Sequence, residues 1–286
     1  MRFRLHLSLG FAITTFLGTV YSERAPAIQE TSKPQMCCPI VELRQYTLHP
    51  GQRDVLIELF DREFVETQEG VGMSIIGQFR DLDKPDRFVW LRGFPDMPSR
   101  ARSLEEFYGG PVWKTHSKVA NATMIDASNV LLLRPARAAS GFSITNSARP
   151  QIGGKEVDGG LVIATIYYFS APVSQDFVEF FERTLKPITK RNGAGVDAYF
   201  VTESSRNTFP KLPVREGEYV FVWFMRFADQ PSYERYRDAL ARSEAWRTKV
   251  EPVLARNLKG APEILKLSPT ARSLWRNANS AQADNK

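Results

Sequence analysis

Apolar and polar residues follow one order twice along the chain. Alternation with a period near two predicts strands, and apolar positions at helical spacing predict helices. The first series reads strand, helix, strand, strand, helix, strand, at residues 40–48, 54–66, 73–79, 87–94, 103–118 and 129–134. The same order returns at residues 160–169, 174–190, 194–202, 219–227, 233–250 and 263–267. The pattern therefore predicts two successive βαββαβ units.

The repeat is also visible in the residues themselves. Phe88-Val89-Trp90 matches Phe221-Val222-Trp223, and Trp113 falls on Trp246 when the same offset is kept. Self-similarity at a fixed offset indicates internal duplication. We interpret the chain as two diverged copies of one small domain.

A βαββαβ unit is ferredoxin-like and carries its helices on one face of a four-stranded sheet. The other face must be covered. Two such units in one chain can cover each other, so the predicted fold class is α+β, with two tandem ferredoxin-like units forming a barrel-like pseudo-dimer within the chain. We expect helices outside and a lined cavity between the two sheets.

The N-terminus is typical of an export signal. Arg2 and Arg4 precede an apolar run from Leu7 to Val20, and small residues precede a cleavage point after Ser22. We expect a periplasmic or secreted protein, with an uncleaved membrane anchor as the alternative. The predicted organisation is a signal peptide (1–22), a flexible lead-in (23–38), a first domain (39–135), a linker (136–159), a diverged second domain (160–268) and a flexible tail (269–286).

Composition narrows the classes of function. The formal net charge of +6 is mild, and no run of five Lys or Arg occurs, so we expect no nucleic-acid partner. No other stretch of the sequence could span a membrane, so we expect no membrane partner after signal cleavage. Without the signal only His49 and His116 remain, and Cys37 and Cys38 are adjacent, so we expect no metal site, no cofactor and an unpaired pair of thiols. Glycine-rich nucleotide loops and nucleophile elbows are missing from the sequence.

Two predicted strands carry the candidate site. Arg44 and Tyr46 share a face with Glu42 on one strand, and Trp90 and Arg92 share a face on another. We expect these mixed faces to line the cavity and the aliphatic faces to meet the helices. Aromatic walls with arginines suit a planar or anionic small molecule. The alternatives are an ordinary core and an Arg44–Glu42 ion pair. The second copy has Thr165 and Met225 at the arginine positions, which favours a site in the first copy.

The segments Cys37–Tyr46, Phe107–His116 and Asn129–Pro135 make the first copy resemble the NIPSNAP family, and the second copy resembles it more weakly. The resemblance implies the dimeric α/β-barrel superfamily, which includes cofactor-free quinol monooxygenases, haem-dependent enzymes and proteins without known activity. Haem-degrading relatives bind iron through a histidine on the helix that here carries His116, three residues after Trp113. A general acid or base and a structural role are the other interpretations of His116.

Three functions remain in view. The first is a module that binds a small hydrophobic or aromatic molecule through Arg44, Tyr46, Trp90, Arg92, Trp113 and His116. The second is a cofactor-free monooxygenase-like enzyme acting on a quinol or electron-rich aromatic, with His116 and Tyr46 as catalytic candidates. The third is a structural or assembly role through exposed sheet edges, in which the chain could form a homo-oligomer.

Overall fold

The computed structural model describes residues 35–144, 149–154 and 160–276. The first half comprises β2 (Ile40–Leu48), α1 (Arg53–Leu59), η1 (Phe60–Phe64), α2 (Val65–Gly70), β3 (Ser74–Asp81), β4 (Arg87–Phe94), α3 (Met97–Gly109), α4 (Pro111–Ala122), β5 (Met124–Asp126) and β6 (Val130–Pro135). The second half comprises β8 (Leu161–Phe169), α5 (Gln175–Phe180), η2 (Phe181–Leu185), α6 (Lys186–Arg191), β9 (Ala198–Thr202), β10 (Tyr219–Phe227), α7 (Gln230–Arg242), α8 (Glu244–Lys249), α9 (Glu251–Asn257) and β11 (Glu263–Pro269).

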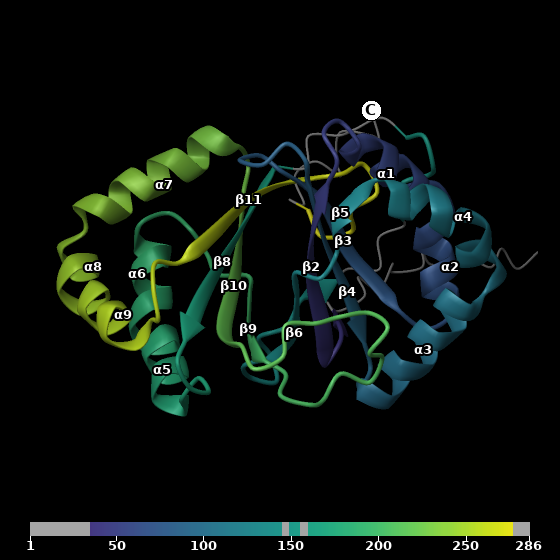
Figure 1. Cartoon of the computed structure of the whole chain (residues 1–286). Helices are drawn as coiled ribbons and strands as arrows, with labels where there is room; N and C mark the ends of the chain where they lie inside the picture. Colours follow the sequence, from purple (N-terminus) through teal and green to yellow (C-terminus); the bar gives the residue numbers. More distant parts are fainter. Residues whose placement is uncertain (1–34, 145–148, 155–159, 277–286) are drawn as a thin grey trace, which may run out of the picture. The chain divides into compact units, whose positions relative to one another are not determined.

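Eight of these strands close into an antiparallel barrel in the order β4-β3-β11-β8-β10-β9-β6-β2, which the β2–β4 pairing completes (Figure 1). Each half contributes four strands in one order, β6-β2-β4-β3 and β11-β8-β10-β9. The halves meet where β3 pairs with β11 and β6 pairs with β9. The predicted fold class is therefore confirmed.

Local details repeat between the halves. Each first helix contains a π-helical turn, η1 or η2, followed by an α-helical end. Each second helix begins with an aspartate that accepts a hydrogen bond from a backbone N–H three residues on, Asp96 from Ser99 and Asp229 from Ser232. These matching helix starts fix the offset between the two halves along α3 and α7.

The barrel interior is apolar and packed. Val41, Leu43, Val89 and Leu91 point inward and are at most 1% exposed. An eight-stranded barrel is just wide enough to be filled by side chains. The predicted cavity between the sheets is therefore wrong: the aliphatic faces meet each other, and the mixed faces lie under the helices. Buried charges need polar partners, and the helices and one loop supply them here.

Two segments expected to be unstructured take part in this core. In the predicted linker, β7 (Ser143–Ile144) pairs with β1 (Gln35–Met36), and Phe142 is buried in the barrel. In the predicted tail, Trp275 packs 4.8 Å from Phe142 between ring centroids. The linker and tail predictions are therefore wrong for these residues, because isolated aromatic side chains in polar stretches close the end of the barrel.

Cys37 and Cys38 are joined as a disulfide in this structure, which contradicts the expectation of unpaired thiols. Their adjacency along the chain brings both sulfur atoms within reach of each other. The export signal lies outside the described residues and stays a prediction. Among the described residues, no helix has the length and apolar character needed to cross a membrane.

Candidate functional site

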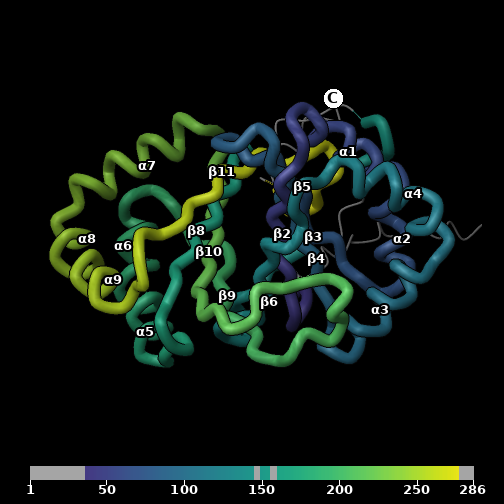
Figure 2. Tube along the Cα trace, viewed as in Figure 1, coloured from purple at the N-terminus to yellow at the C-terminus, as the bar shows by residue number. Residues whose placement is uncertain are grey.

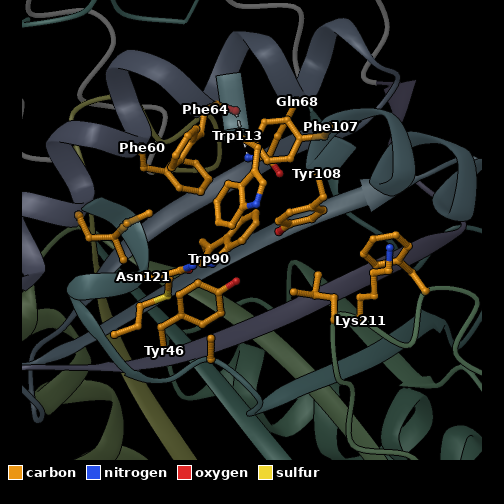
Figure 3. Close-up of a pocket in the computed structure, with 16 residues that line it drawn as sticks. Tyr46, Phe60, Phe64, Gln68, Trp90, Phe107, Tyr108, Trp113, Asn121 and Lys211 are labelled. Carbon is orange, nitrogen blue, oxygen red and sulfur yellow. Dashed lines mark hydrogen bonds between the residues drawn. The ribbon is translucent and has the colours of Figure 1, made fainter. Parts of the chain in front are cut away.

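A cavity of about 360 Å³ lies in the first half, between the outer face of the sheet and helices α1–α4 (Figure 3). Most of its walls are aromatic or aliphatic. The side chains around it are Tyr46, Leu56, Phe60, Phe64, Gln68, Trp90, Phe107, Tyr108, Trp113, Ala120, Asn121, Met124, Ala127, Phe209, Lys211 and Leu212. This volume falls in the range of sites that hold drug-sized ligands.

The aromatic rings around the cavity pack against one another, mostly in edge-on contacts. The Trp90 ring centroid lies 4.8 Å from that of Phe60 and 5.9 Å from that of Tyr46. Across the cavity, the Trp113 ring lies edge-on to Tyr108 with centroids 4.8 Å apart, and it lies tilted by 47° to Phe64 with centroids 5.7 Å apart. Edge-to-face pairs of this kind hold ring orientation. The walls are therefore flat, rigid surfaces suited to a planar molecule.

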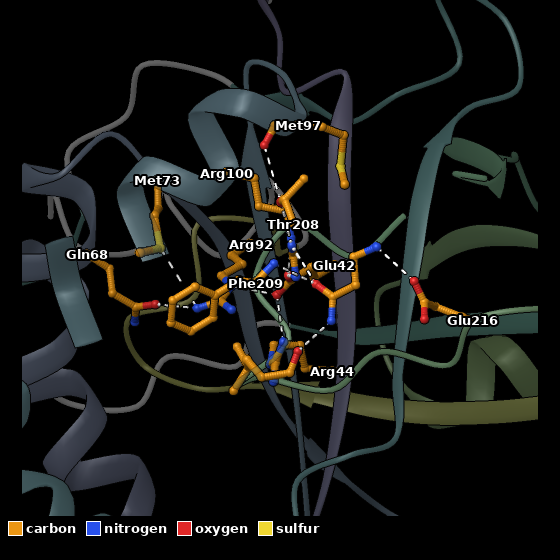
Figure 4. Close-up of polar contacts among 12 residues, drawn as sticks. Glu42, Arg44, Gln68, Met73, Arg92, Met97, Arg100, Thr208, Phe209 and Glu216 are labelled. Carbon is orange, nitrogen blue, oxygen red and sulfur yellow. Dashed lines mark hydrogen bonds and ion pairs between the residues drawn. The ribbon is translucent and has the colours of Figure 1, made fainter. Parts of the chain in front are cut away.

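A charged cluster lies behind these walls (Figure 4). Glu42 accepts hydrogen bonds from Arg44 Nη1, Arg92 Nε and Arg100 Nε, each at 2.7 Å. All four side chains are fully buried. Burial raises the pKa of Glu42, but Arg92, Arg44 and Arg100 outweigh that effect and hold the pKa well below its usual range. Glu42 is thus a permanent anion surrounded by three cations.

The cluster has a net positive charge. One carboxylate faces three guanidinium groups, and arginine stays protonated in proteins. Nη2 of Arg44 and Nη2 of Arg92 have no hydrogen-bond partner among the described residues. Buried cations without full compensation are costly. The surplus of two positive charges therefore favours an electron-rich group nearby.

Three cavity-wall residues connect this charge to the cavity. Arg44 Nε donates a 2.8 Å hydrogen bond to the hydroxyl oxygen of Tyr46. Arg92 Nη1 donates a 3.1 Å hydrogen bond to Gln68, and the Arg92 guanidinium carbon lies 5.0 Å from the centroid of the Trp90 ring. A hydroxyl that accepts from a cation becomes a stronger donor through its own proton. Tyr46 is therefore the natural donor to a ligand oxygen. Burial raises the pKa of its hydroxyl, while Arg44 opposes the rise.

The second half completes the site through the β9–β10 loop, residues 203–218. Asn207 Oδ1 and Thr208 Oγ1 accept hydrogen bonds from Arg100 Nη1 at 3.0 and 3.1 Å. Phe209 stacks on Tyr108, with ring centroids 5.8 Å apart and planes 24° from parallel. The loop extends from the barrel toward α3 in the trace of Figure 2. One wall of the first-half cavity thus comes from the other half of the chain.

The six residues predicted to form the site have different positions. Tyr46, Trp90 and Trp113 line the cavity, whereas Arg44 and Arg92 lie behind its walls. The alternative that Arg44 pairs with Glu42 is confirmed, and Arg92 pairs with the same carboxylate.

His116 is not among the cavity-lining residues. Its Nε2 lies 3.5 Å from Glu63 Oε2 on the outer side of α4, and its side chain is 28% exposed. Its ring is in edge contact with Phe64, whose other contacts form the cavity wall. The surroundings of His116 do not fit a haem, because the histidine that would bind the iron lies against the surface carboxylate of Glu63. Within the described part of the chain, no three His, Cys, Asp or Glu side chains gather as a metal site.

Sequence reasoning missed Arg100 and the β9–β10 loop. Arg100 stands at helical spacing with Leu104 and Phe107, both of which are buried. A charged residue on an apolar helix stripe is a detectable signal. The loop has no such signal, because its contacts with the first half are set only by the closure of the barrel.

Comparison with known proteins finds a family match for the first half. The NIPSNAP family profile matches residues 41–140, and no curated protein matches the sequence. A NIPSNAP-like domain protein from Burkholderia xenovorans has a TM-score of 0.34 and 24% identity, covering 38% of this chain and 94% of its own. A NIPSNAP family protein of unknown function from Agrobacterium tumefaciens has a TM-score of 0.32 and 21% identity, covering 35% and 89%.

An anthrone oxidase-like protein has a TM-score of 0.46 and 15% identity, covering 84% of this chain and 96% of its own. These structural similarities are distant and say nothing about chemistry. The family profile does not extend to the second half, so its origin as a second NIPSNAP copy stays a prediction. The NIPSNAP profile therefore matches residues 41–140, the part of the chain that contains the charged cluster and most of the cavity.

Proposed function

We propose that the first-half cavity binds a planar aromatic molecule with an anionic or ionisable oxygen. The observation that carries the proposal is the arrangement of Glu42 with three buried arginines behind aromatic walls. The flat walls match a ring system in shape, and the surplus positive charge matches an oxyanion. The Tyr46 hydroxyl, held by Arg44, supplies a directed hydrogen bond between the two.

Two probes share one ring system, 2-naphthoate (an anion) and 2-acetylnaphthalene (a neutral ketone), and the test of this cavity uses the anion. Titration calorimetry on the full chain measures naphthoate affinity for the wild type and for Tyr46→Phe. The matched control is Tyr167→Phe, which removes the equivalent hydroxyl in the second half. We expect Tyr46→Phe to weaken naphthoate binding by about tenfold or more, the range for a hydrogen bond to a charged group. Equal effects of the two substitutions, or no naphthoate binding, would contradict the proposal.

A second candidate is cofactor-free oxygenation of a quinol or another electron-rich aromatic in the same cavity. The supporting observation is again the Tyr46–Arg44 contact, because it would stabilise the aryl oxyanion that transfers electrons to O₂. With anthrone, one O₂ would convert the ring CH₂ to a carbonyl and release one water. An oxygen electrode measures this directly. An oxygen-uptake rate with anthrone that is lower in Tyr46→Phe than in the wild type supports an enzyme. A rate no higher than that without protein supports a binding function only.

A further inference from the structure

A second cavity, of about 310 Å³, lies in the second half on the equivalent outer face of the sheet. It is bounded by the outer faces of β8 and β10 and by helices α7–α9. Its aromatic lining consists of Tyr167, Trp223, Tyr233, Tyr236 and Trp246. Trp223 and Trp246 are the sequence equivalents of Trp90 and Trp113, which line the first cavity.

The strand registers establish the equivalence residue by residue. Arg44 faces Trp90 across the β2–β4 pair, and Thr165 faces Trp223 across the β8–β10 pair. One step along the same face, Glu42 faces Arg92, whereas Ile163 faces Met225. The two outer sheet faces therefore superpose in register.

All four members of the charged cluster are replaced by uncharged residues. Ile163 stands for Glu42, Thr165 for Arg44 and Met225 for Arg92. The matching helix starts of α3 and α7 place Tyr233 at the position of Arg100. Arg237 and Glu251 also line this cavity, but both are exposed and opposite in sign. The second cavity therefore keeps the aromatic walls and has a neutral floor.

Two buried polar atoms of residues that line this cavity, the Tyr236 hydroxyl and Nε1 of Trp223, have no hydrogen-bond partner among the described residues. Tyr236 lines the cavity and is 4% exposed, and its hydroxyl makes no hydrogen bond with any described residue. Buried polar groups in folded proteins are almost always satisfied. Burial, with a smaller contribution from Tyr167, raises the pKa of the Tyr236 hydroxyl, so it remains a neutral donor. A ligand oxygen would satisfy it.

We propose that the second-half cavity is a separate binding site for an uncharged aromatic molecule with a carbonyl or hydroxyl oxygen. The oxygen accepts a hydrogen bond from Tyr236, and the rings lie against Trp223 and Trp246. The neutral floor discriminates against anions, because no charged side chain on the floor compensates the desolvation of a buried charge. This site does not depend on the function proposed for the first cavity.

The experiment titrates the full chain with 2-acetylnaphthalene and, separately, with 2-naphthoate. Tyr236→Phe removes only the hydroxyl, and Ala241→Trp fills the cavity from an exposed position on α7. We expect Tyr236→Phe to weaken ketone binding about three- to tenfold, as for one neutral hydrogen bond. Ala241→Trp should abolish ketone binding at this site, and neither substitution should change naphthoate affinity.

Tyr46→Phe serves as the matched control from the first half and should leave ketone binding at the second site unchanged. Circular dichroism and thermal unfolding verify that each variant is folded. The proposal is overturned if the ketone does not bind, if Ala241→Trp leaves its affinity unchanged, or if Ala241→Trp removes naphthoate binding as well. A failure of naphthoate binding alone would affect only the function proposed for the first cavity.

Discussion

The two halves of the barrel present the same sheet face to their helices and differ in its charge. In the first half, Glu42 and three arginines lie behind the aromatic walls. In the second half, the equivalent residues are uncharged: an isoleucine, a threonine, a methionine and a tyrosine. Both halves nevertheless have a buried core and a cavity in the same place. The fold therefore does not require the charged cluster, which points to a role in recognition for it.

The connections β3–β4 and β9–β10, which are equivalent in the two halves, also differ. The β9–β10 loop of the second half spans residues 203–218 and reaches the first-half cavity, where Phe209 and Lys211 contribute to its wall. The equivalent β3–β4 turn of the first half spans only residues 82–86. The first cavity thus has the charged cluster of its own half and, in addition, a wall supplied by the β9–β10 loop of the second half. The charged cluster and the β9–β10 loop are therefore the two features that distinguish the first cavity from the second.

Glu42→Gln gives the largest effect that we predict. The substitution leaves three buried guanidinium groups without their shared anion, and removal of one partner from a buried ion pair typically costs about 3–5 kcal/mol. Chemical denaturation should show a loss of this size. The matched control is Glu218→Gln in the second half, where the ion pair with Arg215 is about one-third exposed. We expect that control to lose less than about 1 kcal/mol. Similar losses in both would mean that the cluster is well solvated.

Exchange of the whole cluster separates stability from recognition. A variant that carries the second-half residues, Glu42→Ile, Arg44→Thr, Arg92→Met and Arg100→Tyr, removes all four charges together. Replacement of a buried ionic cluster by packed neutral residues is often close to neutral for stability, so most of the loss seen with Glu42→Gln should be recovered. Naphthoate affinity should nevertheless fall by about ten- to a hundredfold, the range for a charged hydrogen bond. Retained affinity would show that the arginines do not recognise the ligand.

Much of this comparison could be predicted from the sequence. Strands β2 and β4 begin and end at the predicted residues, because alternation is regular and the Pro50-Gly51 turn marks a clear end. The correspondence of Arg44 with Thr165 and of Arg92 with Met225 also agrees with the strand registers. These features depend on local pattern and on repetition, both of which a single sequence contains.

The direction of each face could not be predicted in this way. Alternation shows that Val41 and Leu43 share a face, but both faces of β2 are almost wholly buried. Which face meets the helices depends on partners distant in sequence, such as Gln68 and Arg100. The burial of Phe142 and Trp275 was missed for the same reason, because the barrel brings them together only after it closes.

Acidification should change the unfolding free energies of the wild type and the exchanged variant differently, by less than the effect of Glu42→Gln. The folded state holds the pKa of Glu42 below its usual value, so this group stabilises the fold above the ordinary glutamate pKa and loses that contribution as the pH falls. Below about pH 4.5, the unfolding free energy of the wild type should fall relative to that of the exchanged variant by at most about 1.4 kcal/mol per pH unit. Urea denaturation at about pH 5 and about pH 3 measures it. Parallel losses in both proteins would assign acid sensitivity to other carboxylates.

The smallest effect concerns the loop that only the first cavity possesses. Phe209→Ala removes the ring that stacks on Tyr108 but leaves the Asn207 and Thr208 contacts with Arg100 in place. An aromatic pair contributes about 0.5–1.5 kcal/mol beyond its buried area, so naphthoate affinity should fall about three- to tenfold, mainly through faster dissociation. Binding of 2-acetylnaphthalene to the second cavity should not change, because the 82–86 turn is too short to form a comparable cover. Leu82→Ala, at an exposed position of that turn, is the control and should affect neither probe. Stopped-flow fluorescence gives both rate constants, and an unchanged dissociation rate in Phe209→Ala would show that the loop shapes the cavity without retaining its ligand.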